Sequence, residues 1–307
     1  MDPFMDWSFK YLFGRDENKD NLISFLQLLL GDDVKIVDLE YVNNELIPEE
    51  EQSKACVFDI ICKDKNGDKF LVEMQKRYMS NFNDRVLYYA CSLITRMGKK
   101  GKEWNYADIK KVYSICVMNF KLGDDSRLRR DFSIKDNIDG QIFSDKLNII
   151  MLQVPCLQAE SIGECTEKYE ILLYLLKQMH KDMKTIEQLK QEVRETRYSD
   201  EIKEIFYNVL DTADVASLSE SDRVRYEAYL KFYRDTMHER RDAIEEGKAE
   251  GRSVGRAEGR AEGLAEGRAE GRAQAIQDVA RSLKAEGTPN DFISRVTGLS
   301  VEEIEKL

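Results

Sequence analysis

The sequence predicts an α/β domain followed by a helical region and a repeat-containing helical tail. Three observations predict this organisation. Short strand-like runs lie between helical patterns over about the first 160 residues, helical apolar stripes follow to about residue 241, and glycine then recurs at every fourth position from 247 to 271. The 307 residues are therefore expected to form four segments, 1–160, 161–241, 242–273 and 274–307.

Seven elements are expected in the first segment, in the order α-β-β-β-α-β-β. They are a helix at 19–30, strands at 34–42, 57–62 and 70–75, a helix at 83–97, and strands at 109–120 and 147–154. Gly31 follows the first helix and Gly98 follows the second, which is typical of helix ends. Pro155 ends the last strand, because proline has no N–H to donate to a neighbouring strand.

The second and third strands flank Asn66-Gly67, a strong hairpin signal. Each strand carries one acid among apolar residues, Asp59 in the first and Glu73 in the second. A three-residue loop with Gly67 left-handed sets Asp59 directly opposite Glu73. Gln75 then lies on the same face as the two acids, whereas a two-residue turn would place the acids on opposite faces.

Two acids opposed in this way indicate a metal site. An ionised carboxylate in an apolar setting is costly unless it is paired or holds a cation. Like charges directly opposite each other destabilise a sheet unless something lies between them. A hard divalent cation with oxygen ligands, Mg²⁺ or Mn²⁺, fits this requirement. The alternative is a surface hairpin whose Asp59 and Glu73 side chains face water.

The spacing of these residues is also similar to that of a known nuclease motif. Asp59, thirteen intervening residues and then Glu73-Met74-Gln75 resemble the motif of PD-(D/E)XK nucleases, with Gln75 at the position of lysine. Residues 6–14, 22–30, 72–75 and 85–90 resemble successive signatures of the Rpn family, the recombination-promoting nucleases or putative transposases. The match covers about residues 5–160, and the repeats of the tail also resemble tails of that family. Each motif is weak by itself, but the combination is specific.

The resemblance implies a restriction-endonuclease-like mixed sheet flanked by helices and a metal-dependent DNA endonuclease acting in recombination or transposition. Asp59 and Glu73 would hold Mg²⁺ or Mn²⁺ with a backbone carbonyl near Met74. Two accessory residues are expected, Asp6 as a further acid and Lys10 near the phosphate. Gln75 can orient a water molecule by hydrogen bonding, but it lacks the charge and the titratable amine of lysine.

The charge distribution bears on the expected DNA partner. A net charge of −11 argues against a general nucleic-acid binder, because neutralising phosphates requires lysine and arginine. Basic residues nevertheless cluster close to the acidic motif in the sequence. The candidate DNA contacts are Lys76, Arg77, Arg85, Lys99, Lys100 and Lys102. The alternative is an ordinary solvated basic surface.

Other features exclude competing functions. The two histidines, His180 and His238, both lie beyond the first segment, and we expect both to be exposed. Histidine-based hydrolases and nucleases therefore lack their essential residue in that segment. No P-loop motif and no apolar run of membrane-spanning length occurs. The N-terminus does not resemble a secretory signal, and six scattered cysteines fit a reducing environment, so we expect a cytoplasmic protein.

Residues 161–307 contain features that suggest binding to other proteins or to a second copy of the chain. The helical region at 161–241 is expected to cap the first segment or to bind a partner. In the repeat, glutamate and arginine fall on roughly opposite faces of a helix, so two chains could pair and form a homo-oligomer. The alternative is a partly helical, solvated spacer. Residues 274–307 predict three short helices, a protein-contact module with an acidic last helix.

Two other functions compete with the nuclease hypothesis. The first is a degenerate nuclease fold that acts as a DNA-binding or assembly factor without catalysis. The second is a transposition component that is active only inside a complex. Metal affinity that depends on both Asp59 and Glu73 would separate an enzyme from a scaffold.

Overall fold

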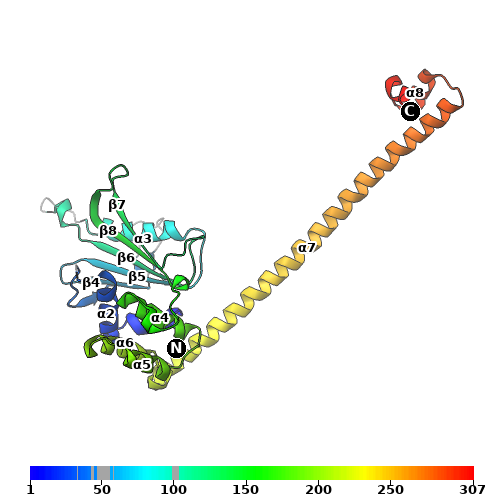
Figure 1. Ribbon diagram of the computed structural model, residues 1–307. Helices are drawn as coiled ribbons and strands as arrows, with labels where there is room; N and C mark the ends of the chain where they lie inside the picture. Colours follow the sequence, from blue (N-terminus) through cyan, green and yellow to red (C-terminus); the bar gives the residue numbers. More distant parts are fainter. Residues whose placement is uncertain (33, 43–44, 47–55, 58, 99–103) are drawn as a thin grey trace. The chain divides into compact units, whose positions relative to one another are not determined.

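The computed structural model describes residues 1–32, 34–42, 45–46, 56–57, 59–98 and 104–307. Two compact units make up the chain, Met1–Tyr229 and Leu230–Leu307. The first unit contains the sheet and most of the helices (Figure 1).

A six-stranded mixed sheet forms the centre of the first unit, in the order β1-β4-β5-β6-β8-β7 (Figure 1). Its strands are β1 Leu39–Tyr41, β4 Ile60–Asp64, β5 Lys69–Gln75, β6 Val112–Met118, β7 Arg129–Lys135 and β8 Ile142–Gln153. The pairs β5-β6 and β6-β8 are parallel and the other pairs are antiparallel. Strands β2 Glu45–Leu46 and β3 Cys56–Val57 form a separate antiparallel pair. The predicted mixed α/β architecture is confirmed.

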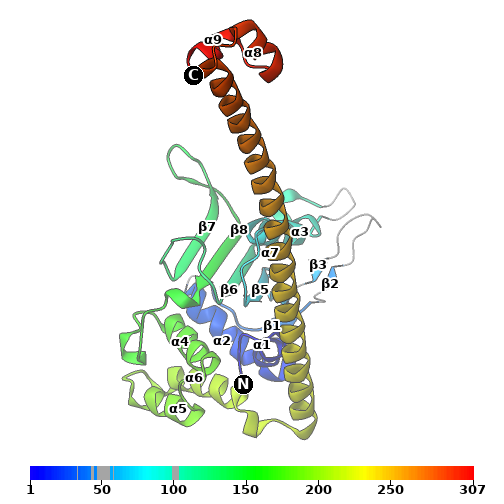
Figure 2. The same ribbon diagram turned by 90° about the vertical axis from the view of Figure 1, so that its right-hand side faces the viewer.

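Helices flank this sheet. The α-helices of the first unit are α1 Asp6–Phe13, α2 Lys19–Leu30, α3 Phe82–Thr95, α4 Lys168–His180, α5 Ile186–Glu195, α6 Asp200–Ala213 and the start of α7 Glu220–Ala285. Short 3₁₀ turns are η1 Asp16–Asn18, η2 Tyr106–Asp108, η3 Val154–Cys156, η4 Ile162–Glu164 and η5 Val215–Ser217. Figure 2 shows α1 and α2 close to α4 and α6 below the sheet.

The two faces of the sheet bury different side chains. On one face Phe70 and Val72 join a large core with α1, α2 and α4 to α6. On the other face Leu71 packs with Ala90 and Leu93 of α3. Because side chains alternate along a strand, Glu73 lies on the same face as Leu71, toward α3. Glu73 therefore lies on the side of the sheet from which Arg85 of α3 reaches it.

Most predicted elements are present with shifted ends. The helix at 19–30 matches α2, and 83–97 corresponds to α3. The strand expected at 34–42 is limited to β1, and the last predicted strand begins earlier, at Ile142. Helix α1 and strand β7 were not predicted as elements. Strand β7 lies at an end of the sheet and is charged and mostly exposed, so it lacks the apolar alternation that identifies a half-buried strand.

The second unit consists of most of α7 with α8 Asn290–Thr297 and α9 Val301–Glu305. The glycine repeat is fully helical, so the alternative of a partly helical spacer is wrong in that respect. Ala280, Ile293 and Ile304 form a small core where the end of α7 meets α8 and α9. In the predicted C-terminal segment 274–307, the first helix is the end of α7 rather than a separate one. Among the described residues, no helix combines the length and apolarity that crossing a membrane requires.

Candidate active site

The register of the β4-β5 hairpin places the two acids opposite each other. Ile60 pairs with Val72 and Ile61 with Leu71, so the next position sets Asp59 against Glu73. The loop has three residues, and Gly67 is left-handed with φ of 84°. The predicted register is therefore confirmed.

The turn that sets this register is held by its first residue. The Asp64 carboxylate accepts hydrogen bonds from the Asn66 and Asp68 backbone N–H groups, at 3.0 and 2.8 Å. The N–H of Gly67 donates to the Asp64 carbonyl at 3.0 Å. A carboxylate that accepts several local bonds stabilises the turn, so the hairpin holds its register from within.

Backbone and amide groups hold both carboxylates. The Met74 N–H donates to Oδ2 of Asp59 at 2.8 Å, and the Asp59 N–H donates to Oε1 of Glu73 at 3.3 Å. Gln75 donates from Nε2 to Oε2 of Glu73 at 2.9 Å. Glu73 is only 6% exposed, whereas Asp59 is half-buried. Neighbouring backbone and amide groups thus orient both acids, and the buried Glu73 does not face water as it would in a surface hairpin.

Two helices place basic side chains near the two acids. From α1, Lys10 bonds Asp6 through Nζ at 2.9 Å. Burial alone would lower the pKa of Lys10, but its bond to Asp6 and the charges of Asp59 and Glu73 raise it. From α3, Arg85 lies 3.8 Å from Oε2 of Glu73. Lys10 therefore remains cationic, and two basic side chains lie beside the acidic pair.

The pKa values of both carboxyl groups are raised, so the two acids are harder to ionise than free carboxyl groups. Burial raises the pKa of Asp59, and the nearby Asp6 carboxylate raises it further, against the hydrogen bond from Met74. Burial likewise raises the pKa of Glu73, and the Asp59 charge adds to this, while Arg85 opposes it. An added cation between the two carboxylates would favour their ionised forms.

The donor set fits a hard divalent cation. Asp59 and Glu73 offer carboxylate oxygens in a partly buried setting, and such ligands suit Mg²⁺ and Mn²⁺. In the part of the chain that the structure describes, no group of three or more His, Cys, Asp or Glu side chains could hold a metal. The pair would therefore need oxygens from the backbone or from water, which Mg²⁺ commonly retains.

A polar network that the sequence did not suggest lies at the end of β5. His180 of α4 contacts the Asp2 carboxylate through Nδ1 at 2.8 Å and Asn119 through Nε2 at 3.0 Å. Asp2 also pairs with Lys76 at 3.3 Å. The Asn119 N–H donates to the Gln75 carbonyl at 2.9 Å. The expectation that His180 is an exposed bystander is wrong, because residues 178 positions apart meet through packing that no local pattern encodes.

The structure describes three of the six candidate DNA contacts, and each lies in a different setting. Lys76 is half-buried and paired with Asp2, Arg77 is exposed, and Arg85 lies beside Glu73. The other three, Lys99, Lys100 and Lys102, lie outside the described residues.

Comparison with known proteins adds one finding. A family model described as "PD-(D/E)XK nuclease family transposase" matches residues 3–243. Neither the curated proteins nor the solved structures contain a significant match.

Proposed function

The chain belongs to the PD-(D/E)XK nuclease family transposases, and on this premise we propose that it is a metal-dependent DNA endonuclease acting in recombination or transposition. The observation that carries the proposal is the direct opposition of Asp59 and Glu73 on a partly buried strand pair. A scaffold would gain nothing from this arrangement, because two opposed acids cost stability unless a cation offsets them.

Each residue of the cluster has a proposed role. Asp59 and Glu73, with a backbone carbonyl near Met74, would hold Mg²⁺ or Mn²⁺. When bound, such an ion activates a water molecule and offsets charge on the attacked phosphate. Gln75 bonds Glu73 through its amide nitrogen, which leaves its carbonyl oxygen to accept a hydrogen bond from a water molecule.

The cations around the acids suit a phosphodiester substrate. Lys10 and Arg85 flank the carboxylates from two different helices, and Asp6 holds Lys10 in place. We propose that Lys10 approaches the scissile phosphate and that Arg77, exposed just after β5, contacts the DNA backbone. Lys76, Lys99, Lys100 and Lys102 remain proposed contacts. A DNA substrate and the free thiols of Cys62 and Cys116 favour a cytoplasmic location.

One observation favours a second function, that of a catalytically inactive DNA-binding or assembly factor. Gln75 stands where the motif has lysine, and it contributes no charge to the site. A factor of this kind would bind DNA without cleaving it.

Plasmid cleavage tests the proposal. The purified chain is incubated with supercoiled plasmid in Mg²⁺ or Mn²⁺, beside Asp59→Ala, Glu73→Ala and the isosteric Asp59→Asn and Glu73→Gln variants. We expect nicking or linearisation by the parent chain and its loss in all four variants, with thermal unfolding showing that they remain folded. Equal cleavage by all the proteins would attribute the activity to a contaminant. No cleavage, with DNA binding retained, would favour the second function.

A further inference from the structure

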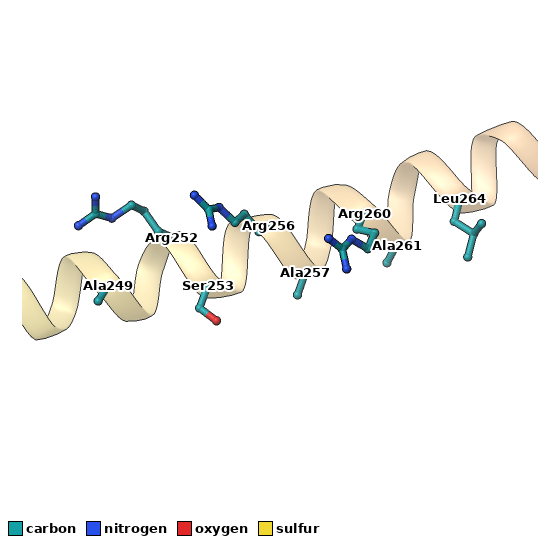
Figure 3. A pocket seen from close by; sticks show the side chains of 8 residues that line it. All are labelled: Ala249, Arg252, Ser253, Arg256, Ala257, Arg260, Ala261 and Leu264. Atoms are coloured by element: carbon teal, nitrogen blue, oxygen red, sulfur yellow. The ribbon is translucent and has the colours of Figure 1, made fainter.

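The exposed part of α7 carries four distinct stripes of side chains. Every residue from 239 to 275 is exposed. In the general pattern of the four-residue repeat, glycine is followed by a basic residue, then by alanine or serine, and then by glutamate. The exceptions are Leu264 at a basic position and Val254 and Gln274 at glutamate positions. Figure 3 shows Arg252, Arg256 and Arg260 in a row, with Ala257 and Ala261 on another side of the helix. At 100° per residue, a basic and an acidic stripe flank each small-residue face.

The charged residues of the repeat are badly spaced for ion pairs within one helix. Residues four apart are neighbours on a helix, and here they carry the same charge, as in Arg256 and Arg260 or Glu258 and Glu262. Opposite charges are two apart and do not face each other. An ion pair that does form, Lys248 with Glu245 at 3.1 Å, uses an acid that precedes the repeat. The helix therefore presents one basic stripe and one acidic stripe, and its own side chains do not neutralise either of them.

The glycines of the repeat also indicate that α7 has a closely packed partner. A Cβ at any of Gly247, Gly251, Gly255, Gly259, Gly263, Gly267 or Gly271 would meet nothing within 4 Å. Alanine would fit there and favours a helix far more than glycine does. The single chain therefore gains nothing from glycine at these positions, whereas a closely approaching second backbone would.

We propose that residues 247–273 of α7 form a docking surface for the same segment of a second copy, in parallel and in register. In a parallel two-fold pair whose glycine faces meet, the basic flank of one helix lies against the acidic flank of the other along both edges. In an antiparallel two-fold pair, arginine would lie against arginine and glutamate against glutamate. Charge complementarity thus selects both the partner and its direction.

The repeat also sets the hand of the pair. A four-residue period exceeds the 3.6 residues of a helical turn, so each stripe advances around the helix in the right-handed sense. Two helices that keep these stripes in contact wind around each other right-handed. A parallel pair brings two N-terminal units to the same end of the paired helices, and this consequence holds whether or not those units cleave DNA.

Cysteine cross-linking tests direction and register. The full chain with the exposed Cys91 replaced by serine serves as the parent, and Gly251→Cys and Gly267→Cys are introduced singly. We expect each variant to form a disulfide-linked dimer with itself under mild oxidation, while the parent does not. Cross-linking only in a mixture of the two variants would show antiparallel pairing and overturn the proposal. No cross-linking in any sample would overturn it as well.

Charge reversal tests the driving force independently of cysteine chemistry. One variant carries Arg256→Glu, Arg260→Glu and Arg268→Glu, and the other carries Glu258→Arg, Glu262→Arg and Glu266→Arg. We expect each alone to dimerise more weakly than the parent by more than about ten-fold, because both flanks become like-charged. Light scattering should show that mixing the two restores the dimer and that high salt weakens the parent dimer. A monomeric parent at the highest soluble concentration, or variants that dimerise as well as the parent, would overturn the proposal.

Discussion

The Asp2 carboxylate lies 2.8 Å from Nδ1 of His180, which joins the N-terminal segment to the end of α4. Burial alone would raise the pKa of Asp2, but the His180 hydrogen bond and the Lys76 charge lower it. A lowered carboxyl pKa stabilises the fold above the ordinary pKa and loses this contribution as the pH falls. The same histidine reaches Asn119, whose N–H bonds the Gln75 carbonyl, so the network supports the strand end beside the candidate site.

We expect His180→Ala to lower the free energy of unfolding by about 1–3 kcal/mol, because it removes one hydrogen-bond partner from the half-buried Asp2 carboxylate and one from the Asn119 amide. Urea unfolding at neutral pH measures the change. The matched control is His238→Ala, since His238 is exposed and its removal should have little effect. Equal stability of the two variants would contradict a structural role for the Asp2–His180 pair.

The buried acids should make stability fall with rising pH. Because the pKa of Glu73 is raised by burial and by Asp59, the folded chain keeps a proton that the unfolded chain has lost. The free energy of unfolding therefore decreases as the pH rises above the ordinary carboxyl pKa of about 4 toward the raised value. Thermal unfolding across this range should show a shallower decrease in Glu73→Gln than in the parent chain.

Two comparisons sharpen this pH experiment. Glu262→Gln removes an exposed acid of the repeat and should leave the slope unchanged. Added Mn²⁺ should stabilise the parent chain most at high pH, where both carboxylates are ionised, and should have less effect on Glu73→Gln. Identical slopes in parent and Glu73→Gln would show that Glu73 titrates normally.

Gln75 is expected to act by orienting Glu73 and water. Gln75→Ala removes the 2.9 Å bond to Glu73, and we expect cleavage to decrease by about 10- to 100-fold. Gln75→Lys places a cation beside Glu73, which lowers the pKa of that acid and should shift the cleavage profile to lower pH. Initial nicking rates between pH 6 and 9, with exposed Gln141→Ala as control, measure both effects. A pH profile unaltered by lysine would exclude electrostatic coupling between the two side chains.

Gly67 should be required for the hairpin register. Its φ of 84° suits glycine, and a Cβ would come no closer than 3.4 Å to Lys110, so strain would arise from the backbone alone. We expect Gly67→Ala to lower the free energy of unfolding by about 1–2 kcal/mol. Gly67→Asn should cost less, because asparagine tolerates this conformation.

The control for this substitution is Gly163→Ala, at a glycine without positive φ and with Ser161 as its nearest neighbour at 3.9 Å. It should leave stability nearly unchanged. If Gly67→Ala and Gly163→Ala are equally stable in urea, the left-handed conformation is not what holds the loop.

Local patterns were enough to predict the features that depend on neighbouring residues. The Asn66-Gly67 turn and the strict alternation of strands set Asp59 against Glu73, because a hairpin register is decided within a few residues of the turn. Helix α2 ends where Gly31 follows its apolar pattern, and the four-residue repeat shows its charge stripes without any tertiary contact.

Only the tertiary structure decided which distant groups complete the site. The sheet buries one face against α1 and α2 and the other against α3, and this packing brings Lys10 and Arg85 to the acids. It also joins His180 to Asp2 across most of the chain. Such contacts depend on the shapes of whole packed layers, whereas periodicity and turn chemistry act over a few residues. The sequence therefore determined the acidic pair, and the fold determined its charged surroundings.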